Sequence, residues 1–278
     1  VADQTVSVDT TDDDVAGFTI EETDGSTEVD ESGSTDTFTV VLDAEPTSDV
    51  VLTITSDDTG EATVPASVTF TAANWDTPQT VTVTGEDDDL VDGTITSTIT
   101  IAVDDANSDD DFDAVTDQTL SVDTTDDDVA GFTIEETEGA TEVDESGSTD
   151  TFTIVLDAQP TNDVVVLATA SNDETEAIVS GSITFTSENW DTPQTVTVTG
   201  VDDDLVDGDQ TYDITISIVD TISDDDFDGV ADQSVSSTTL DDDAPGFTIE
   251  ETDAATEVDE SGSTDTFTVV LDAQPTSD

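Results

Sequence analysis

The acidic residues of this chain gather in short runs whose chemistry is cation binding. An aspartate triplet lies in the stretch TTDDDVAGFTIEE at 10–22, which recurs at 124–136 and, with small changes, at 239–251. A second triplet follows the stretch QTVTVTG at 79–85 and recurs at 202–204. Hard cations such as Ca²⁺ take about six to eight oxygen ligands, and aspartates in loops supply such oxygens. The two kinds of triplet are therefore candidate parts of a metal site.

The charge of the chain points the same way. It has 73 acidic residues and no lysine, arginine or histidine, which gives a formal net charge of −73. Two carboxylates about 4 Å apart repel by about 1 kcal/mol in water and about 4 kcal/mol near a protein surface. No side chain can supply the counter-charge, so cations from outside are implied.

Several classes of function and partner are excluded by composition. Nucleic acid and anionic membranes attract basic side chains, which this chain lacks, and no apolar run approaches the roughly 20 residues of a membrane span. Without His, Cys, Lys or Arg, nucleophilic triads and Schiff bases are excluded, and only a carboxylate-pair glycosidase remains. Because the carboxylates repeat along the chain instead of forming one distinctive cleft, we predict that the protein is not an enzyme.

A repeat of about 115 residues organises the chain, since Phe18, Phe132 and Phe247 fall in the same local sequence and Trp75 matches Trp190. This is the size of an independent domain. We expect residues 1–15 to be the last strand of a preceding repeat, 16–129 and 130–244 to be complete repeats, and 245–278 to open a third. The simplest interpretation is a segment of a longer tandem array, and the alternative is a subunit that donates a strand to its neighbour.

Alternation of Val, Phe or Ile with Thr predicts strands, and it argues against the disorder that high acidity with few aromatic residues otherwise indicates. Many short strands with turn residues between them predict an all-β fold of Ig-like antiparallel Greek-key sandwiches in a linear array. In the first complete repeat we expect seven strands, near 17–21, 36–42, 50–55, 68–71, 79–84, 94–103 and 118–123. The expected core contains Phe18, Ile20, Val29, Phe38, Val40, Leu42, Val51, Ile54, Val68, Phe70, Trp75, Val81, Val83, Ile99, Ile101 and Val122.

The triplets fall at strand ends that share one pole of such a sandwich, so we expect them to converge. One set closes each repeat, and the other set follows the QTVTVTG strand. The candidate ligands of this kind are Asp12, Asp13, Asp14, Asp126, Asp127, Asp128, Asp241, Asp242 and Asp243 at the ends of repeats, and Asp87, Asp88, Asp89, Asp92, Asp202, Asp203, Asp204 and Asp207 in the loops.

These residues also carry a family resemblance. The stretch VDESG at 29–33 resembles the V-x-E-x-G element of Calx-beta domains, TVTVTGEDDD resembles their strand with its acidic loop, and SVDTTDDDVAG resembles their closing strand. The tandem form is similar to repeats of large bacterial surface proteins. The resemblance implies a seven-stranded sandwich that binds several Ca²⁺ ions at one end, and it adds Glu31, Asp57 or Asp58, Glu145 and Asp173 as ligands. The chain departs from exchanger-type domains after the loop triplet, where LVDG replaces further glutamates, and this leaves the number of ions open.

A third acidic cluster, SDDDFDG at 223–229, has Asp224, Asp226 and Asp228 in the order of an EF-hand loop. The glutamate expected at its twelfth position is missing, because Val235 stands there. Either a separate calcium site or a plain acidic loop fits this cluster.

The leading hypothesis is a calcium-stiffened extracellular rod: an adhesin stalk, a surface filament or a matrix protein with Ca²⁺ at the junctions between repeats. Its partners would be adjacent repeats of the same chain, with homopolymer formation or lateral self-association as further expectations. One alternative is a Ca²⁺-dependent adhesive or carbohydrate-binding module. Another is a halophilic acidic surface protein without discrete metal sites, although that hypothesis predicts acids on strand faces, where this sequence has threonine.

Overall fold

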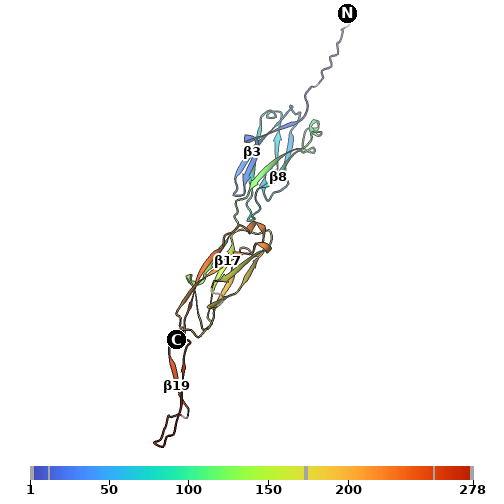
Figure 1. Cartoon of the computed structure of the whole chain (residues 1–278). Coiled ribbons are helices and arrows are strands. Elements are labelled where there is room, and N and C mark those ends of the chain that lie inside the picture. The colour runs from blue at the N-terminus through green and yellow to red at the C-terminus, as the bar shows by residue number, and fades with distance from the viewer. Residues whose placement is uncertain (1–2, 12, 172–174, 253, 276–278) are drawn as a thin grey trace. The chain divides into compact units, whose positions relative to one another are not determined.

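The computed structural model describes the chain except for residues 1–2, 12, 172–174, 253 and 276–278, and it does not describe the side chain of residue 138. The chain divides into two compact units, Val1–Asp128 and Val129–Asp278 (Figure 1). Each unit has its own hydrophobic core. None of the described residues forms a helix long and apolar enough to cross a membrane.

The first unit is a sandwich of two β-sheets, with strand orders β1-β3-β7-β5 and β2-β9-β8-β4-β6. Figure 1 labels β3 from one sheet and β8 from the other. The elements are β1 (Phe18–Glu22), the 3-10 helix η1 (Thr23–Gly25), β2 (Thr27–Asp30), β3 (Thr35–Leu42), β4 (Val50–Ser56), β5 (Ala62–Thr63), β6 (Ser67–Phe70), β7 (Gln79–Gly85), β8 (Ile95–Val103), the 3-10 helix η2 (Asp110–Phe112) and β9 (Gln118–Thr125).

The second unit repeats this sandwich, with strand orders β10-β12-β16-β14 and β11-β18-β17-β13-β15. Its elements are β10 (Phe132–Glu136), η3 (Thr137–Gly139), β11 (Thr141–Asp144), β12 (Thr149–Leu156), β13 (Val164–Ala170), β14 (Ala177–Val179), β15 (Ser182–Phe185), β16 (Gln194–Gly200), β17 (Gln210–Ile218), η4 (Asp220–Ile222), η5 (Asp225–Phe227) and β18 (Gln233–Leu240). A two-stranded sheet of β19 (Phe247–Glu251) and β20 (Phe267–Leu271) follows. The predicted all-β sandwich class is confirmed.

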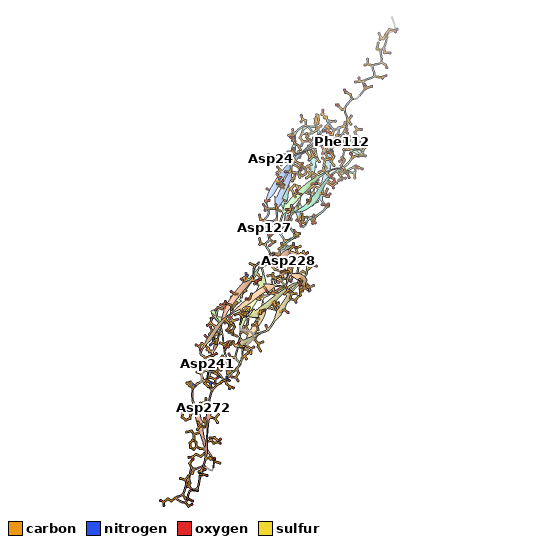
Figure 2. All side chains as sticks on the ribbon, viewed as in Figure 1. Asp24, Phe112, Asp127, Asp228, Asp241 and Asp272 are labelled. Carbon is orange, nitrogen blue, oxygen red and sulfur yellow. The ribbon has the colours of Figure 1, made fainter. Side chains whose placement is uncertain are left out.

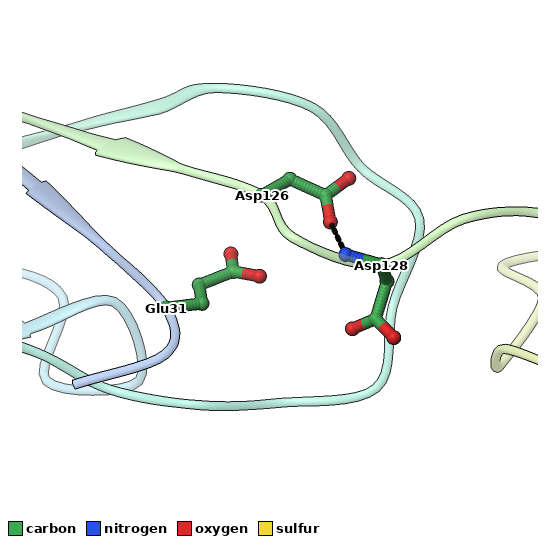
Figure 3. Close-up of side chains that lie close together, drawn as sticks. All are labelled: Glu31, Asp126 and Asp128. Carbon is green, nitrogen blue, oxygen red and sulfur yellow. Dashed lines mark hydrogen bonds between the residues drawn. The ribbon is translucent and has the colours of Figure 1, made fainter.

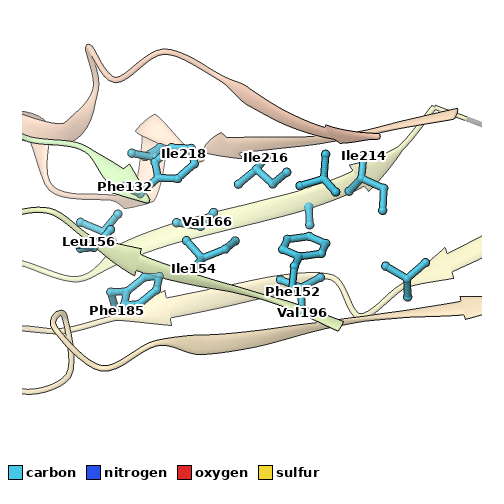
Figure 4. Close-up of a cluster of buried hydrophobic side chains, with 14 of the residues drawn as sticks. Phe132, Phe152, Ile154, Leu156, Val166, Phe185, Val196, Ile214, Ile216 and Ile218 are labelled. Carbon is cyan, nitrogen blue, oxygen red and sulfur yellow. The ribbon is translucent and has the colours of Figure 1, made fainter. Parts of the chain in front are cut away.

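Alternating side chains explain why these segments pair as strands. In β3, Phe38 and Val40 are fully buried while Thr37 and Thr39 point outward. Phe38 lies opposite Val81 of β7, so the inner faces of neighbouring strands form one apolar layer. Figure 4 shows the equivalent layer of the second unit. Apolar burial of this kind stabilises each sandwich by about 25 cal/mol per Å² of buried apolar surface.

Strand β4 corrects one detail of the predicted core. Val50, Leu52 and Ile54 are buried, whereas Val51 is only half-buried. The sequence prediction placed Val51 and Ile54 together in the core, which is wrong because residues three apart in a strand face opposite sides.

Two short strands, β2 and β5, were not predicted, and β2 departs from the expected antiparallel pairing. It pairs in parallel with β9, so that Val29 lies opposite Thr124. The alternation of β2 is Thr27 and Val29 inward, Glu28 and Asp30 outward, and its four residues are too few to stand out in the sequence. This strand leads directly into the acidic cluster.

A glycine sets the distance between β7 and the end of β2. A Cβ atom on Gly85 would lie 2.0 Å from the carbonyl oxygen of Asp30, and Gly200 has the same relation to Asp144 in the second unit. The N–H of Gly85 also donates to the carbonyl oxygen of Ser34 at 3.0 Å. The absence of a side chain at this position lets the turn after β2 lie against the start of the loop that carries Asp87–Asp89.

The exposed large apolar side chains lie mainly outside the two sandwiches. Phe247 and Phe267 of the β19–β20 pair are 61% and 54% exposed, whereas their equivalents Phe132 and Phe152 are 3% and 0% exposed. Because β19 and β20 pair only with each other in the described part of the chain, their apolar face has no second sheet to pack against.

Candidate metal centre

Glu31 is a carboxylate buried at the end of strand β2. Its N–H donates to the carbonyl oxygen of Thr125 at 3.1 Å, so the parallel ladder between β2 and β9 continues for one more residue. The N–H of Asp30 donates to Ser34 Oγ at 2.7 Å and holds the following turn. The Glu31 side chain is 1% exposed, and neither of its carboxylate oxygens has a hydrogen-bond partner.

Asp126 and Asp128 follow strand β9 and lie beside Glu31 (Figure 3). Asp126 Oδ1 accepts the N–H of Asp128 at 2.7 Å, and its Oδ2 accepts those of Asp92 at 3.0 Å and Gly93 at 2.8 Å. One carboxylate oxygen from each of Glu31, Asp126 and Asp128 lies within 4.8 Å of the others. The terminal triplet and the loop after β7 are therefore joined at one end of the first unit.

A second group in the same unit consists of Glu61, Asp88 and Asp92, with one oxygen from each again within 4.8 Å of the others. Glu61 immediately precedes β5 and is 6% exposed, and its Oε2 has no hydrogen-bond partner. Asp88 Oδ1 accepts the N–H of Leu90 at 2.7 Å, which orders the loop. Glu61 was not among the predicted ligands, although its recurrence as Glu176 at the repeat spacing was a signal that could have identified it.

The second unit brings together Glu145, Asp203 and Asp243. One carboxylate oxygen from each of these residues lies within 4.8 Å of the others. Glu145 is 1% exposed, and its Oε2 and Asp243 Oδ2 are buried without a hydrogen-bond partner. Asp241 Oδ1 accepts the N–H of Asp243 at 2.8 Å, and its Oδ2 accepts that of Gly208 at 2.7 Å. Glu145 and Asp243 are the repeat equivalents of Glu31 and Asp128, whereas Asp203 is the equivalent of Asp88 in the loop after β7.

Burial and mutual repulsion raise the pKa values of several of these carboxyl groups. Burial raises the pKa of Glu31 to about 7, with the charge of Asp126 as the next cause, and burial likewise raises the pKa of Glu145 to about 7, with Asp203 next. Burial and then Asp126 raise the pKa of Asp128 to about 6. Each cluster therefore has an excess of negative charge that a proton or a cation can neutralise.

The donor set fits a hard divalent cation. The side-chain ligands of the three clusters are all carboxylates, whose oxygens Ca²⁺, Mg²⁺ and Mn²⁺ prefer, and the chain contains no His or Cys to attract softer metals. The buried, unpartnered oxygens of Glu31 and Glu145 are the decisive feature, because buried polar atoms in proteins are almost always satisfied by a partner.

Other predicted ligands lie near these clusters or have backbone partners. Asp57 Oδ1 accepts the N–H of Thr98 at 2.6 Å, and Asp58 Oδ1 accepts that of Gly60 at 3.0 Å. The charge of Asp89 contributes to the raised pKa of Asp128. The exposed members of the predicted set are Asp13, Asp14, Asp57, Asp58, Asp87, Asp89, Asp127, Asp202, Asp204, Asp207, Asp226, Asp228 and Asp242. Asp12 and Asp173 lie outside the described residues.

The cluster at 224–228 is built differently. Asp224 is 3% exposed, and its Oδ2 accepts Thr161 Oγ1 at 2.9 Å and the N–H of Asn162 at 2.6 Å, while its Oδ1 accepts the N–H of Asp226 at 3.3 Å. It thereby caps η5, and Figure 2 shows Asp228 and Asp241 at opposite ends of the unit. Asp109 holds the Thr47 loop in the same way, and hydrogen bonds, led by that from the Thr47 side chain, lower its pKa to about 2. The separate calcium site stays a prediction.

No protein-family model and no curated protein matches the sequence. Among solved structures, the chain is similar to CBD12 from CALX1.2, with 14% identity, a TM-score of 0.30, and coverage of 71% of this chain and 79% of that one. It is similar to domains 5–6 of the S-layer protein SbsC, with 18% identity, a TM-score of 0.27, and coverage of 83% and 100%. The apo-form Calx CBD1 domain has 16% identity, a TM-score of 0.28, and coverage of 40% and 98%. At these TM-scores the likenesses establish neither function nor metal content for this chain.

Proposed function

We propose that each unit is a calcium-binding structural module, and that the chain is a segment of an extracellular rod or fibre whose units are fixed at one end by Ca²⁺. The observation that supports this most is the pair of equivalent glutamates, Glu31 and Glu145. Each is 1% exposed, has at least one oxygen without a hydrogen-bond partner, and lies among other carboxylates. Since the chain has no cationic side chain, only an outside cation can neutralise these sites without protonating them.

The composition of the clusters favours Ca²⁺ over Mg²⁺. Calcium accepts several carboxylates in flexible geometry, whereas Mg²⁺ requires a near-ideal octahedron and keeps most of its water. Three carboxylates approach one another in each cluster, with further aspartates in the same loops. Extracellular calcium modules bind with a dissociation constant of roughly 10⁻⁴ to 10⁻³ M, which suits an environment with millimolar Ca²⁺ and not the cytosol.

The position of the first site explains the structural role. Asp126 and Asp128 are the last ligands along the first unit, whose final residue is Asp128. An ion shared with Glu31 would fix these last residues to the end of β2, and therefore fix the direction in which the chain leaves the unit. In a tandem chain, the same arrangement at every unit would reduce flexibility along the whole length. The same proposal includes lateral association or polymerisation of such chains.

Calorimetric titration of the full chain with Ca²⁺ tests the ion site. The double variant Glu31→Gln, Glu145→Gln removes one charge from each cluster and keeps the shape of the side chain. We expect at least a tenfold loss of affinity at these sites. The control Glu21→Gln, Glu135→Gln removes two exposed glutamates from equivalent strands and should bind as the wild type does. Equal binding by both variants would overturn the proposed sites.

Small-angle scattering of the full chain tests the rod. With 10 mM Ca²⁺ we expect a larger and better-defined maximum dimension than in chelator at the same ionic strength. Unchanged scattering from a chain that binds Ca²⁺ would leave a calcium-binding module but contradict the stiffening role.

A further inference from the structure

Two apolar residues, Leu205 and Val206, follow the aspartate triplet in the loop after β16, where LVDG replaces further glutamates. Neither side chain can bind a cation. Both are nevertheless half-buried in a loop whose other residues are mainly acidic and exposed. Their burial therefore has another cause than the metal centre.

Backbone hydrogen bonds on both sides of these two residues fix the loop to its own sandwich. The N–H of Leu205 donates to Asp203 Oδ1 at 2.7 Å, and the N–H of Gly208 donates to Asp241 Oδ2 at 2.7 Å. The Gln210 side chain donates to the carbonyl oxygen of Gly208 at 2.9 Å. Hydrogen bonds within the protein thus hold the two apolar residues in a defined place.

A short segment of the next repeat, Ala-Gln-Pro at 273–275, contacts this loop through the backbone. The N–H of Gln274 donates to the carbonyl oxygen of Asp204 at 2.5 Å. Gln274 also forms an isolated parallel β-bridge with Leu205. Because the segment directly follows β20, the contact connects the second sandwich to the opening strands of the next repeat.

A small hollow of about 220 Å³ lies beside this backbone contact, and Val206 lines it from the loop. The other lining residues belong to the next repeat and are Pro245, Gly246, Leu271, Ala273, Gln274 and Pro275. The side chains that line the hollow are all uncharged. Two strongly acidic repeats therefore meet here without placing carboxylates against each other, which would cost repulsion.

The first unit has a hollow of about 310 Å³ at the equivalent place. Phe112, a member of the hydrophobic core, also lines it. Four of the lining residues are repeat equivalents of those in the next repeat, namely Ala16, Ala44, Glu45 and Pro46. The receiving surface is therefore a feature of a complete sandwich as well as of the short third repeat.

The two sequences that meet in this contact recur together along the chain. LVDG begins at 90 and at 205, and A-x-P begins at 44, 158 and 273. From 90 to 158 and from 205 to 273 the separation is the same 68 residues. The pairing of loop and segment is thus part of the repeat itself.

We infer that the LVDG loop is the docking element of each repeat, and that its Leu and Val bind the A-x-P segment of the repeat that follows in the chain. The contact consists of a backbone hydrogen bond and uncharged side chains, so it forms with or without Ca²⁺. The inference deepens the proposed rod by naming the surfaces that join successive repeats. It does not depend on the proposed ion sites, because no carboxylate oxygen takes part in it.

Spin-label distances in the full chain test this contact. The chain has no cysteine, so Thr211→Cys and Glu250→Cys label one exposed site on β17 and one on β19. With the native loop we expect one narrow distance distribution, in chelator as well as in 10 mM Ca²⁺. Leu205→Ser with Val206→Ser should widen the distribution by about twofold or more, because adjacent domains without a firm interface move relative to each other.

A second pair of variants tests the backbone hydrogen bond. Gln274→Pro removes the N–H that donates to Asp204 and should widen the distribution, whereas Gln274→Ala keeps this N–H and should leave it narrow. Leu167→Ser, at an exposed apolar residue of β13, is the control for the loop variant and should also leave it narrow. Melting of each variant in chelator checks that the sandwiches remain folded.

A narrow distribution in both the loop variant and Gln274→Pro would overturn the inference, because the next repeat would then be held by other contacts. A broad distribution for the native loop in chelator would also overturn it, whether or not Ca²⁺ narrows the distribution. Calorimetric titration tests the proposed function separately, since the loop variant keeps every carboxylate and should bind Ca²⁺ as the wild type does. A native chain that binds no Ca²⁺ but gives a narrow distribution would overturn only the proposed function.

Discussion

Asp126 joins the end of the first unit to the loop after β7, because its Oδ2 accepts the backbone N–H of Gly93 at 2.8 Å. The equivalent bond in the second unit runs from Gly208 to Asp241 at 2.7 Å. These bonds use the carboxylates of the terminal triplets to place loop and strand end together, and the remaining carboxylates then converge on a buried glutamate. The fold therefore gathers carboxylates at one end of each unit, and their negative charge must be neutralised by a proton or a cation.

Neutralising Glu31 should change stability in opposite directions with and without Ca²⁺. At pH 8 in chelator, Glu31→Gln removes a buried charge and should raise the melting temperature. In 10 mM Ca²⁺ it removes a ligand, and the loss of ion binding should lower stability by about 1.4 to 2.7 kcal/mol for a dissociation constant of roughly 10⁻³ to 10⁻⁴ M. Calorimetric melting measures both, with the exposed Glu21→Gln as control. The same sign under both conditions would contradict the metal-ligand role.

The cation-free protein should lose stability as the pH rises from 5 to 8. Burial raises the pKa of Glu31 to about 7 from an ordinary value of 4.5, and that of Asp128 to about 6 from 3.8. Between the unfolded and folded pKa values the folded state binds more protons, so this stabilisation is complete below the unfolded pKa and is lost as the pH passes the folded pKa.

Chemical denaturation in chelator at several pH values measures this dependence. The variant Glu31→Gln, Glu145→Gln should show a smaller slope. With Ca²⁺ present the trend should weaken or reverse, because protons compete with the ion. If the double variant and the wild type show the same change of stability with pH, groups other than Glu31 and Glu145 cause the pH dependence.

Adding a methyl group at Gly200 should separate strand β16 from the turn that carries Glu145. A Cβ there would lie 2.0 Å from the carbonyl oxygen of Asp144, so Gly200→Ala should destabilise the second unit by about 1 to 3 kcal/mol and weaken its ion binding. Gly229→Ala is the matched control, because no heavy atom lies within 4 Å of its Cβ position. Denaturant-induced unfolding measures the stability of the two variants. An equal loss of stability in both would contradict a stabilising role for the close approach of Gly200 to Asp144.

Much of this architecture follows from the sequence, and the omissions have physical causes. Alternating Thr and Val in long strands such as β7 identifies them, whereas β5 has two residues and is defined only by its partner β7. The convergence of Asp126 with the loop at Asp92 follows from sandwich topology. The burial of Glu61 does not, because it depends on contacts with residues 25 and 63 positions further along the chain.

Asp224 should stabilise the second unit through hydrogen bonds and not through a metal ion. Asp224→Ala removes the acceptor of Thr161, Asn162 and Asp226 and should destabilise the unit by about 1.5 to 3 kcal/mol, with the number of bound Ca²⁺ ions unchanged. The exposed neighbour variant Asp225→Asn should be nearly neutral. Loss of an ion from Asp224→Ala would restore the EF-hand-like interpretation.

The most direct test of the account is calorimetric unfolding of the full chain at pH 7.5 in high NaCl, first with 10 mM Ca²⁺ and then with chelator. Because the high salt already screens diffuse repulsion, a specific site predicts that chelation lowers the melting temperature by about 5 to 10 °C. An unchanged melting temperature would contradict it, and would mean that the aspartate clusters of this chain are satisfied by salt and water alone.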